Sequence, residues 1–398
     1  VTMSPIDEFR QQTRAWLEEN CPASQRRPVV KDEQIWAGRD RVFATPDAKL
    51  WFERMRDKGW TAPTWPTEYG GGGLSSDEEK VLEKEMARLN CRPALYDLGL
   101  WMLGPALLVH GNEAQKQEHI SKIVRGDIRW AQGYSEPAAG SDLASLKTRA
   151  EDMGDHFLVN GTKIWTTQAD KADWIFALVR TDSSGTKHQG ISFMLIDMRS
   201  AGVSTTPIEL ISGDSEFCQT FFDDVKVPKE NIVGELNNGW AVAKELLKHE
   251  RKLMATMESI VQREDESLVE LATEYIGMDE SGKLNDSTIR SRITDQLMTA
   301  DALEYLNERL FFQYRSKQVD SGLPLTVKYL GTNAIQQKDE LLLQILGNHG
   351  LSWQEQSHTP REHNIVQNWA YNKAHTIAGG TSEIQLNIIA KRALGLPA

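Results

Sequence analysis

The 398-residue sequence predicts an α+β protein in which helical and β-rich segments are segregated along the chain. Apolar residues recur three and four positions apart up to about residue 125, which is typical of amphipathic helices. From about Trp130, short β-branched and aromatic runs alternate with turn residues, and after Gly239 the helical pattern returns. Segregated runs favour an α+β or multidomain architecture over an alternating βαβ sheet. We expect domains at residues 1–128, 129–237 and 238–398.

The helical segments carry recognisable starts and breaks. "DEFRQQTRAWLEEN" and "DEEKVLEKEMARLN" begin with acidic residues, which favour helix N-termini. The stretch "APTWPTEYGGGGLSS" predicts a loop between helices, and "MDESGKLNDS" and "GNHGLSWQEQSHTPRE" predict breaks in the C-terminal helical part.

The central segment predicts closely spaced strands. Its runs "DHFLVNGTKIWTT", "ADWIFALVRT", "GISFMLIDM", "VSTTPIEL" and "CQTFFDDVKVP" are short and separated by turn residues. We expect them to form an antiparallel sheet or a small barrel.

Composition excludes several classes of protein. A net charge of −12 argues against a nucleic-acid binder, which needs a basic surface. No apolar run approaches the roughly 20 residues that cross a bilayer, and the N-terminus lacks the apolar core of a signal peptide. The three cysteines, Cys21, Cys91 and Cys218, have no metal-binding spacing. We expect a cytoplasmic protein without membrane insertion.

Five local patterns have a structural interpretation, and four of them also have a functional one. "GYSEPAAGSDLASLKTRA" either connects two regions or offers Ser135, Ser141 and nearby backbone N–H groups to a phosphate or a flavin edge. Trp165, followed by two threonines at a strand end, is either a core residue or a flat surface for an aromatic cofactor. Gln344 and Gly347 mark a helix that ends in a glycine loop, for which a C-terminal cap is sufficient reason.

The fourth pattern is "HTIAGGTSEIQ", near the C-terminus. Ser382 with Gln385 fits a capping box, and a helix start that follows glycines favours an anion.

The fifth pattern, "LLKHERKLM", places Glu250 and Arg251 together. They form either a solvated face or a carboxylate base beside a phosphate-binding guanidinium. We predict no metal site, because a proline separates the two histidines of "HTPREH".

Taken together, these motifs resemble the acyl-CoA dehydrogenase family over essentially the whole chain. The resemblance is carried by "GYSEPAAGSDLASLKTRA", "VNGTKIWTT", "FFDDVKVPKENIVGE" and "GGTSEIQLNIIAKRALG", with "GWTAPTWPTEYGG" upstream. It implies an N-terminal all-α domain, a central β-domain and a C-terminal four-helix bundle. It also implies FAD as cofactor and a homo-oligomer, dimer or tetramer, with a hetero-oligomer as the alternative.

The resemblance implies a reaction as well. Family members remove the pro-R α-proton of an acyl-CoA thioester while flavin N5 accepts the β-hydrogen as hydride, and the 2,3-enoyl-CoA results. Electrons usually pass to an electron-transfer flavoprotein. The acyl chain stays open among straight, branched, steroid and aromatic types.

Position by position, the resemblance assigns residues to the cofactor and the substrate. Ser141 lies near the pyrophosphate or the ligand, and Arg251 matches an arginine on the CoA side of the bundle. The residues matched to FAD-binding positions are Tyr134, Ser135, Ser141, Trp165, Thr167, Gln344, Gly347, Thr381 and Glu383.

One departure concerns the catalytic base. Many members carry a glutamate where this chain has Gly379, whereas the isovaleryl- and long-chain-type branches carry it directly before an arginine, where this chain has Glu250. A thioester α-proton requires a desolvated base and donors aimed at the enolate oxygen. We therefore predict Glu250 as the base and the Gly379 N–H as an oxyanion donor.

Other departures affect the adenine side of the cofactor. "GNHG" replaces two consecutive glycines, and Ala138 replaces a common glycine. The Arg-x-x-Phe-Gly pattern is missing, with Arg290 or Arg292 as substitutes. Two alternatives to a working dehydrogenase follow, namely a non-catalytic subunit that depends on a partner and an oxygen-using relative.

Overall fold

The computed structural model describes residues 4–29, 31–249, 266–316, 318, 320, 322–351, 353 and 358–397. Contacts divide this part of the chain into two units. One unit contains residues 4–208 and 216–249, and the other contains residues 209–215 and 266–397. Each unit has its own hydrophobic core.

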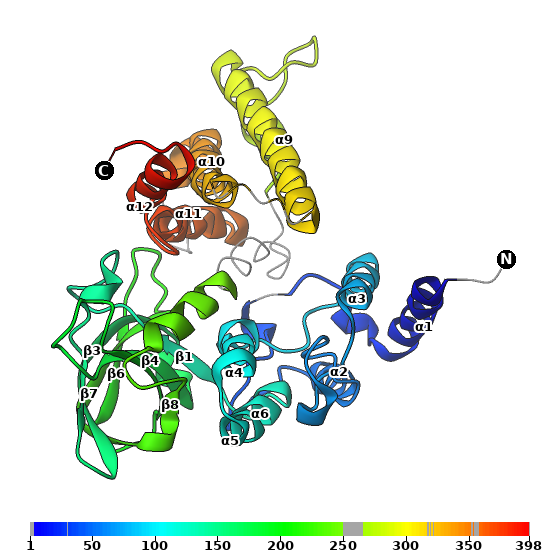
Figure 1. The fold of residues 1–398 in the computed structure, drawn as a ribbon. Helices are drawn as coiled ribbons and strands as arrows, with labels where there is room; N and C mark the ends of the chain where they lie inside the picture. The colour runs from blue at the N-terminus through cyan, green and yellow to red at the C-terminus, as the bar shows by residue number, and fades with distance from the viewer. Residues whose placement is uncertain are drawn as a thin grey trace. The chain divides into compact units, whose positions relative to one another are not determined.

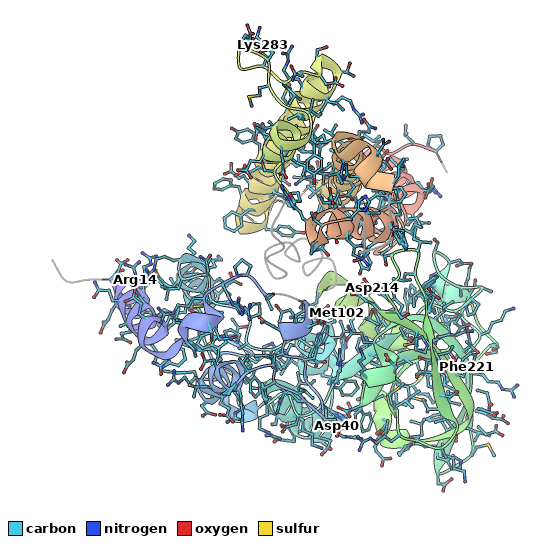
Figure 2. All side chains as sticks on the ribbon, turned by 180° about the vertical axis from the view of Figure 1, so that it is seen from behind. Arg14, Asp40, Met102, Asp214, Phe221 and Lys283 are labelled. Atoms are coloured by element: carbon cyan, nitrogen blue, oxygen red, sulfur yellow. The ribbon has the colours of Figure 1, made fainter. Side chains whose placement is uncertain are left out.

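The first unit begins with helices, as the sequence predicts (Figure 1). Ser4 caps the first helix by accepting a hydrogen bond from the Asp7 N–H, and Ser75 forms a capping box with Glu78 at the third. Arg14 on the first helix, labelled in Figure 2, binds both oxygens of Glu85 on the third at 2.9 Å. The α-helices that precede the sheet are α1 (Pro5–Asn20), α2 (Pro46–Asp57), α3 (Ser76–Arg88), α4 (Gly104–His110), α5 (Glu113–Gln115) and α6 (Ser121–Val124), and residues 239–249 after the sheet are also helical.

A single sheet follows the helices. Within the described residues its strand order is β6-β7-β3-β2-β4-β5-β8, and β1 pairs with β4. Most pairs are antiparallel, as predicted, whereas β4 pairs in parallel with both β1 and β2. The strands are β1 (Trp130–Gly133), β2 (Arg149–Asp152), β3 (His156–Thr167), β4 (Trp174–Arg180), β5 (Ile191–Asp197), β6 (Val203–Ile208), β7 (Phe217–Pro228) and β8 (Ile232–Val233).

The central strand β4 is buried on both faces. Phe176 and Leu178 belong to a core that the sheet shares with the helical segment. Ile175, Ala177 and Val179 belong to a second core, together with residues of β3, β5 and β7. Because successive side chains of a strand point to opposite faces, burial on both sides requires the unbroken apolar run that the sequence shows.

Polar contacts also join the helical segment to the sheet. The Gln115 amide donates to the carbonyls of Glu230 and Ile232, both at 2.7 Å. The buried carboxylate of Asp97 accepts a hydrogen bond from the Trp130 N–H at the start of β1, at 3.0 Å. Met102 lies in this helical region (Figure 2) and is buried.

The second unit is helical. Its long helix α10 contacts α8, α9, α11 and α12, and its core includes Leu271, Ile293, Leu341, Ile345 and Ile365. The predicted breaks lie between α8 and α9 and between α10 and α11. Across the described residues, no helix has the length and apolar character needed to span a bilayer. The helices are α8 (Leu268–Tyr275), α9 (Ser287–Ser316), α10 (Leu323–Leu346), α11 (Pro360–Asn372) and α12 (Ser382–Ile388).

Candidate active site

Trp165 lies at a bulge near the end of β3. Lys163 pairs with Thr220 and Thr166 with Cys218, so β3 advances three residues where β7 advances two. Trp165 takes up the extra residue with a φ of 60°, in the left-handed region that costs a bulky residue roughly 1–2 kcal/mol. Its indole is 53% exposed and touches Phe217 edge-on. The indole is therefore not a core side chain, and strain of this kind is concentrated at functional sites.

The threonines that follow Trp165 have different surroundings. The Thr166 side chain is buried, and its hydroxyl lies 2.8 Å from the carbonyl oxygen of Cys218 and from the Thr220 hydroxyl. Thr167 is half-buried at the last position of β3. Gln168, with a φ of 47°, then turns the chain away from the strand. Thr166 is thus a structural residue, whereas Thr167 stays partly accessible beside Trp165.

The loop after β1 is organised by a buried carboxylate. Glu136 accepts hydrogen bonds from the N–H groups of Lys147 (2.6 Å) and Thr148 (2.8 Å) and from the ammonium of Lys163 (2.8 Å). Burial alone would raise the pKa of Glu136, but the charge of Lys163 and these hydrogen bonds outweigh burial and hold the pKa below its ordinary value. The two ends of the loop are therefore tied to β3.

The same contacts bring Tyr134 and Ser135 to β3. The Lys163 ammonium also donates to the Tyr134 carbonyl at 3.1 Å, and the Ile164 N–H donates to the Ser135 carbonyl at 2.9 Å. The Tyr134 ring is buried edge-on against Phe176 and Phe193. Tyr134 and Ser135 therefore pair with the strand immediately before Trp165.

Ser141 lies further along this loop and is exposed. The Arg180 guanidinium, at the end of β4, donates to the Ala144 carbonyl at 2.7 Å. Lys187 binds Asp142 at 2.7 Å. The hairpin between β4 and β5 thus holds the segment that carries Ser141.

In the second unit, Thr381 caps α12. Its side chain accepts a hydrogen bond from the Ile384 N–H at 3.2 Å. The predicted capping box of Ser382 with Gln385 is wrong, because Thr381 has the extended backbone that a cap requires and Ser382 is the first helical residue. The Gln385 amide instead donates to the carbonyls of Gly379 (3.2 Å) and Gly380 (3.3 Å).

Gly379 and Gly380 both have left-handed backbones, with φ of 64° and 92°. A Cβ at Gly380 would lie 2.6 Å from the Gln385 amide nitrogen, whereas a Cβ at Gly379 would meet nothing within 4 Å. At Gly379 it is therefore the backbone conformation, and not space, that favours glycine. Gly379 is exposed, and no backbone acceptor among the described residues takes its N–H.

Lys328 of α10 also binds the loop that contains Gly379 and Gly380. Its ammonium donates to the Gly380 carbonyl at 2.8 Å and to the His375 carbonyl at 3.2 Å. Burial lowers the pKa of Lys328, and the nearby Glu383 acts in the opposite direction. Glu383 itself is exposed, and hydrogen bonds from its own N–H and from Thr381 hold its pKa below the ordinary value.

Gln344 and Gly347 lie at the opposite end of α10. Gly347 ends the helix with a φ of 57°, as the C-cap interpretation expects, and Gln344 accepts a hydrogen bond from Arg292 of α9. About 16 helical residues separate Gln344 from Lys328, which is about 24 Å at 1.5 Å per residue. Within one chain, the structure therefore does not bring Gln344 and Gly347 together with Thr381 and Glu383.

Glu250 and Arg251, the predicted base and the predicted CoA-side arginine, lie outside the described residues.

Three supporting side chains are not among the site residues that the sequence predicts: Glu136, Lys163 and Lys328. A carboxylate within a run of small residues, and a lysine within a strand, were the available signals for the first two. Nothing in the sequence near Lys328 distinguishes it from a surface lysine. Across the described residues, no cluster of histidine, cysteine and carboxylate side chains could hold a metal ion.

Three domain models of one protein family match this chain in sequence order. Residues 6–127, 131–225 and 237–394 match the N-terminal, middle and C-terminal domain models of acyl-CoA dehydrogenase. The chain is 33% identical to acyl-CoA dehydrogenase IpdE1 of Mycobacterium tuberculosis over 397 residues, which is 99% of each protein.

Solved structures are similar over the same length. The Tcur3481-Tcur3483 steroid ACAD has a TM-score of 0.77 and 30% identity, with 100% of this chain and 99% of that chain covered. The ChsE4-ChsE5 complex of Mycobacterium tuberculosis has a TM-score of 0.72 and 26% identity, with the same coverage.

Proposed function

The chain belongs to the acyl-CoA dehydrogenase family, and we propose on that basis that it binds FAD and converts an acyl-CoA thioester into its 2,3-enoyl-CoA. Membership makes it an oxidoreductase of lipid catabolism. The observation that carries the finer proposal is the exposed, left-handed Trp165 at the end of β3, beside the loop that Glu136 anchors.

The described residues fit a flavin. An indole that is 53% exposed offers an aromatic face, and the partly accessible Thr167 offers a hydroxyl beside it. We propose that Trp165 and Thr167 flank the isoalloxazine ring and that Tyr134 and Ser135 meet its pyrimidine edge. When bound, FAD supplies the hydride acceptor for the β-hydrogen. Rigid support of these residues by the Glu136–Lys163 pair is what accurate placement of such a ring requires.

The proton chemistry is assigned to the C-terminal part of the chain. We propose that Glu250 takes the α-proton and that the N–H of Gly379 donates to the thioester carbonyl oxygen. A left-handed Gly379, exposed and with its carbonyl held by Gln385, supports the donor role. Arg251 is proposed on the CoA side, and Ser141 near the pyrophosphate or the substrate.

We propose that two groups of residues contact two different cofactors. Thr381 and Glu383 would hold the phosphate and adenosine part of one FAD, and Gln344 and Gly347 would contact the FAD of a neighbouring subunit. Lys328, which binds the loop before Thr381, and Gln344 lie near opposite ends of α10, which supports this division. Arg292, which binds Gln344, is the better candidate than Arg290 for the missing arginine contact.

We further propose a steroid-derived acyl-CoA as the substrate class and an electron-transfer flavoprotein as the electron acceptor. The substrate proposal is supported by the 30% identity with a protein described as a steroid ACAD. A homo-oligomer in the cytoplasm is the simplest assembly.

A second candidate function is a subunit that depends on a different partner chain. It is favoured by the similarity to the ChsE4-ChsE5 complex and the Tcur3481-Tcur3483 protein, whose names join two proteins. Such a subunit, purified alone, would be colourless and would bind FAD only when its partner is present.

The experiment is anaerobic titration of the purified protein with a panel of straight-chain, branched and steroid-bearing acyl-CoA thioesters. Our proposal predicts a yellow protein whose flavin absorbance is bleached by at least one thioester, and most efficiently by a steroid-bearing one. A yellow protein that no member of the panel reduces would contradict the dehydrogenase function.

A further inference from the structure

Glu362 is a buried carboxylate at the start of α11, with only 4% of its surface exposed. One oxygen accepts the Thr359 N–H at 2.7 Å in a capping box. The other accepts the Tyr275 hydroxyl at 2.7 Å and lies 2.9 Å from Nδ1 of His349. Burial would raise the pKa of Glu362, but these hydrogen bonds outweigh burial and lower the pKa to about 2. The carboxylate is therefore an anion that gathers donors from three segments.

The contact favours one tautomer of His349. A carboxylate has no proton to donate, so a hydrogen on Nδ1 suits the 2.9 Å distance to Glu362. The imidazole also packs edge-on against Tyr275, at 5.6 Å between ring centroids, and against His358, at 5.5 Å. The His349 side chain is thus held by the 2.9 Å contact with the Glu362 carboxylate and by two ring contacts.

His349 belongs to the turn Gly347–Leu351, which follows α10. The turn contains "GNHG", where the resemblance implies two consecutive glycines in many family members. A Cβ at Gly350 would lie 2.9 Å from the Leu343 carbonyl oxygen, so the turn packs closely on α10 there. At Gly347, by contrast, a Cβ would meet nothing within 4 Å. The exposed, left-handed Gly347 has no side chain with which to fix its own position.

We propose that His349 is a positioning residue for the cofactor, because its contact with the Glu362 carboxylate fixes the Gly347 backbone in the orientation that meets FAD. This inference rests on the proposed function, in which Gly347 contacts FAD. The turn is then already ordered before FAD binds, so less of the binding free energy is lost in ordering it.

The experiment measures the FAD dissociation constant of the full-length protein after removal of FAD and reconstitution. His349→Ala and Glu362→Gln are each expected to weaken FAD binding about tenfold, as loss of a polar contact with a charged group does. The double variant is expected to bind FAD no more weakly than either single variant, since both substitutions remove the same contact between His349 and Glu362. The thermal midpoint of each FAD-free variant shows whether folding is retained.

Three further variants separate positioning from general stability. His349→Asn places an amide donor where Nδ1 lies and should restore wild-type affinity, whereas His349→Gln places its donor further out and should not. Tyr275→Phe removes another donor from the same Glu362 oxygen but keeps the ring that packs against His349, and should leave the FAD affinity within about twofold of wild type.

Two results would overturn the proposal. One is wild-type FAD affinity in His349→Ala, and the other is an equal loss of affinity in Tyr275→Phe. A wild-type protein that takes up no FAD under any condition would instead contradict the proposed function itself.

Discussion

The Lys163 ammonium and the Glu136 carboxylate form an ion pair at 2.8 Å between a strand and a loop, with the lysine side chain fully buried and the glutamate 8% exposed. The pair joins the end of β3, which presents Trp165, to the loop that carries Tyr134, Ser135 and Ser141. A change at either partner should therefore affect both the stability of the first unit and the geometry of the proposed flavin site.

Glu136→Gln should destabilise the protein by about 3 kcal/mol at pH 7, because it leaves the buried Lys163 without its counter-charge. The folded-state pKa of Glu136 lies below the ordinary value, so its stabilising contribution is complete above the unfolded-state pKa of about 4.3. It is lost as the pH falls through the lower folded-state pKa. Urea unfolding of wild type and variant should therefore differ at pH 7 and converge towards low pH.

Glu118→Gln is the matched control, since Glu118 pairs with Lys122 on an exposed helical surface. It should change the free energy of unfolding by less than about 1 kcal/mol at either pH. A Glu136→Gln variant as stable as this control would show that the buried pair does not anchor the loop.

Trp165→Gly should separate backbone strain from cofactor binding. Glycine adopts a φ of 60° without penalty, so the FAD-free variant should be at least as stable as wild type. Loss of the indole face should nevertheless weaken FAD binding by about tenfold or more. The two measurements are the thermal midpoint without FAD and the FAD dissociation constant.

Trp165→Phe serves as the control because it keeps an aromatic face in the same strained backbone. It should bind FAD more tightly than Trp165→Gly. Equal affinities for the glycine and phenylalanine variants would argue that the ring at this position does not touch the flavin.

Gln385→Ala should slow flavin reduction by the acyl-CoA. The amide holds the carbonyls of Gly379 and Gly380, so its removal should loosen the proposed oxyanion donor. We expect the rate of reduction at saturating substrate to fall about tenfold while bound FAD is retained. Rapid-mixing absorbance under anaerobic conditions measures this rate.

Asn387→Ala, an exposed position on the same helix α12, should leave the rate of flavin reduction unchanged. If the Gln385 variant reduces flavin as fast as the Asn387 variant does, Gly379 does not depend on this support.

Several elements follow directly from local sequence. The Ser75–Glu78 capping box and the unbroken apolar run of β4 are produced by nearest neighbours and by burial, which the sequence reveals. The order of helices, strands and helices is likewise local in origin. These features fix the fold class, which the comparisons confirm.

The site depends more on contacts between distant segments. "NGTKIWTT" gives no sign that Trp165 adopts a left-handed backbone, because the bulge is imposed by pairing with β7. The sequence predicts that Gln385 takes part in capping its own helix. Thr381 caps α12 instead, so the Gln385 amide is available to donate to the glycine carbonyls. Lys328 reaches the same loop from a helix about 50 residues earlier in the chain. Tertiary packing determines these backbone conformations and hydrogen-bond partners, and local propensity does not encode them.

Anaerobic flavin reduction in Glu250→Gln tests the central claim most directly. Wild-type and variant proteins, both loaded with FAD, would be mixed with the acyl-CoA that best bleaches the wild type. Our account predicts that the variant keeps its FAD spectrum and binds the thioester, but that its flavin is not reduced, because no base removes the α-proton. Flavin reduction at the wild-type rate in Glu250→Gln would contradict the assignment of the base.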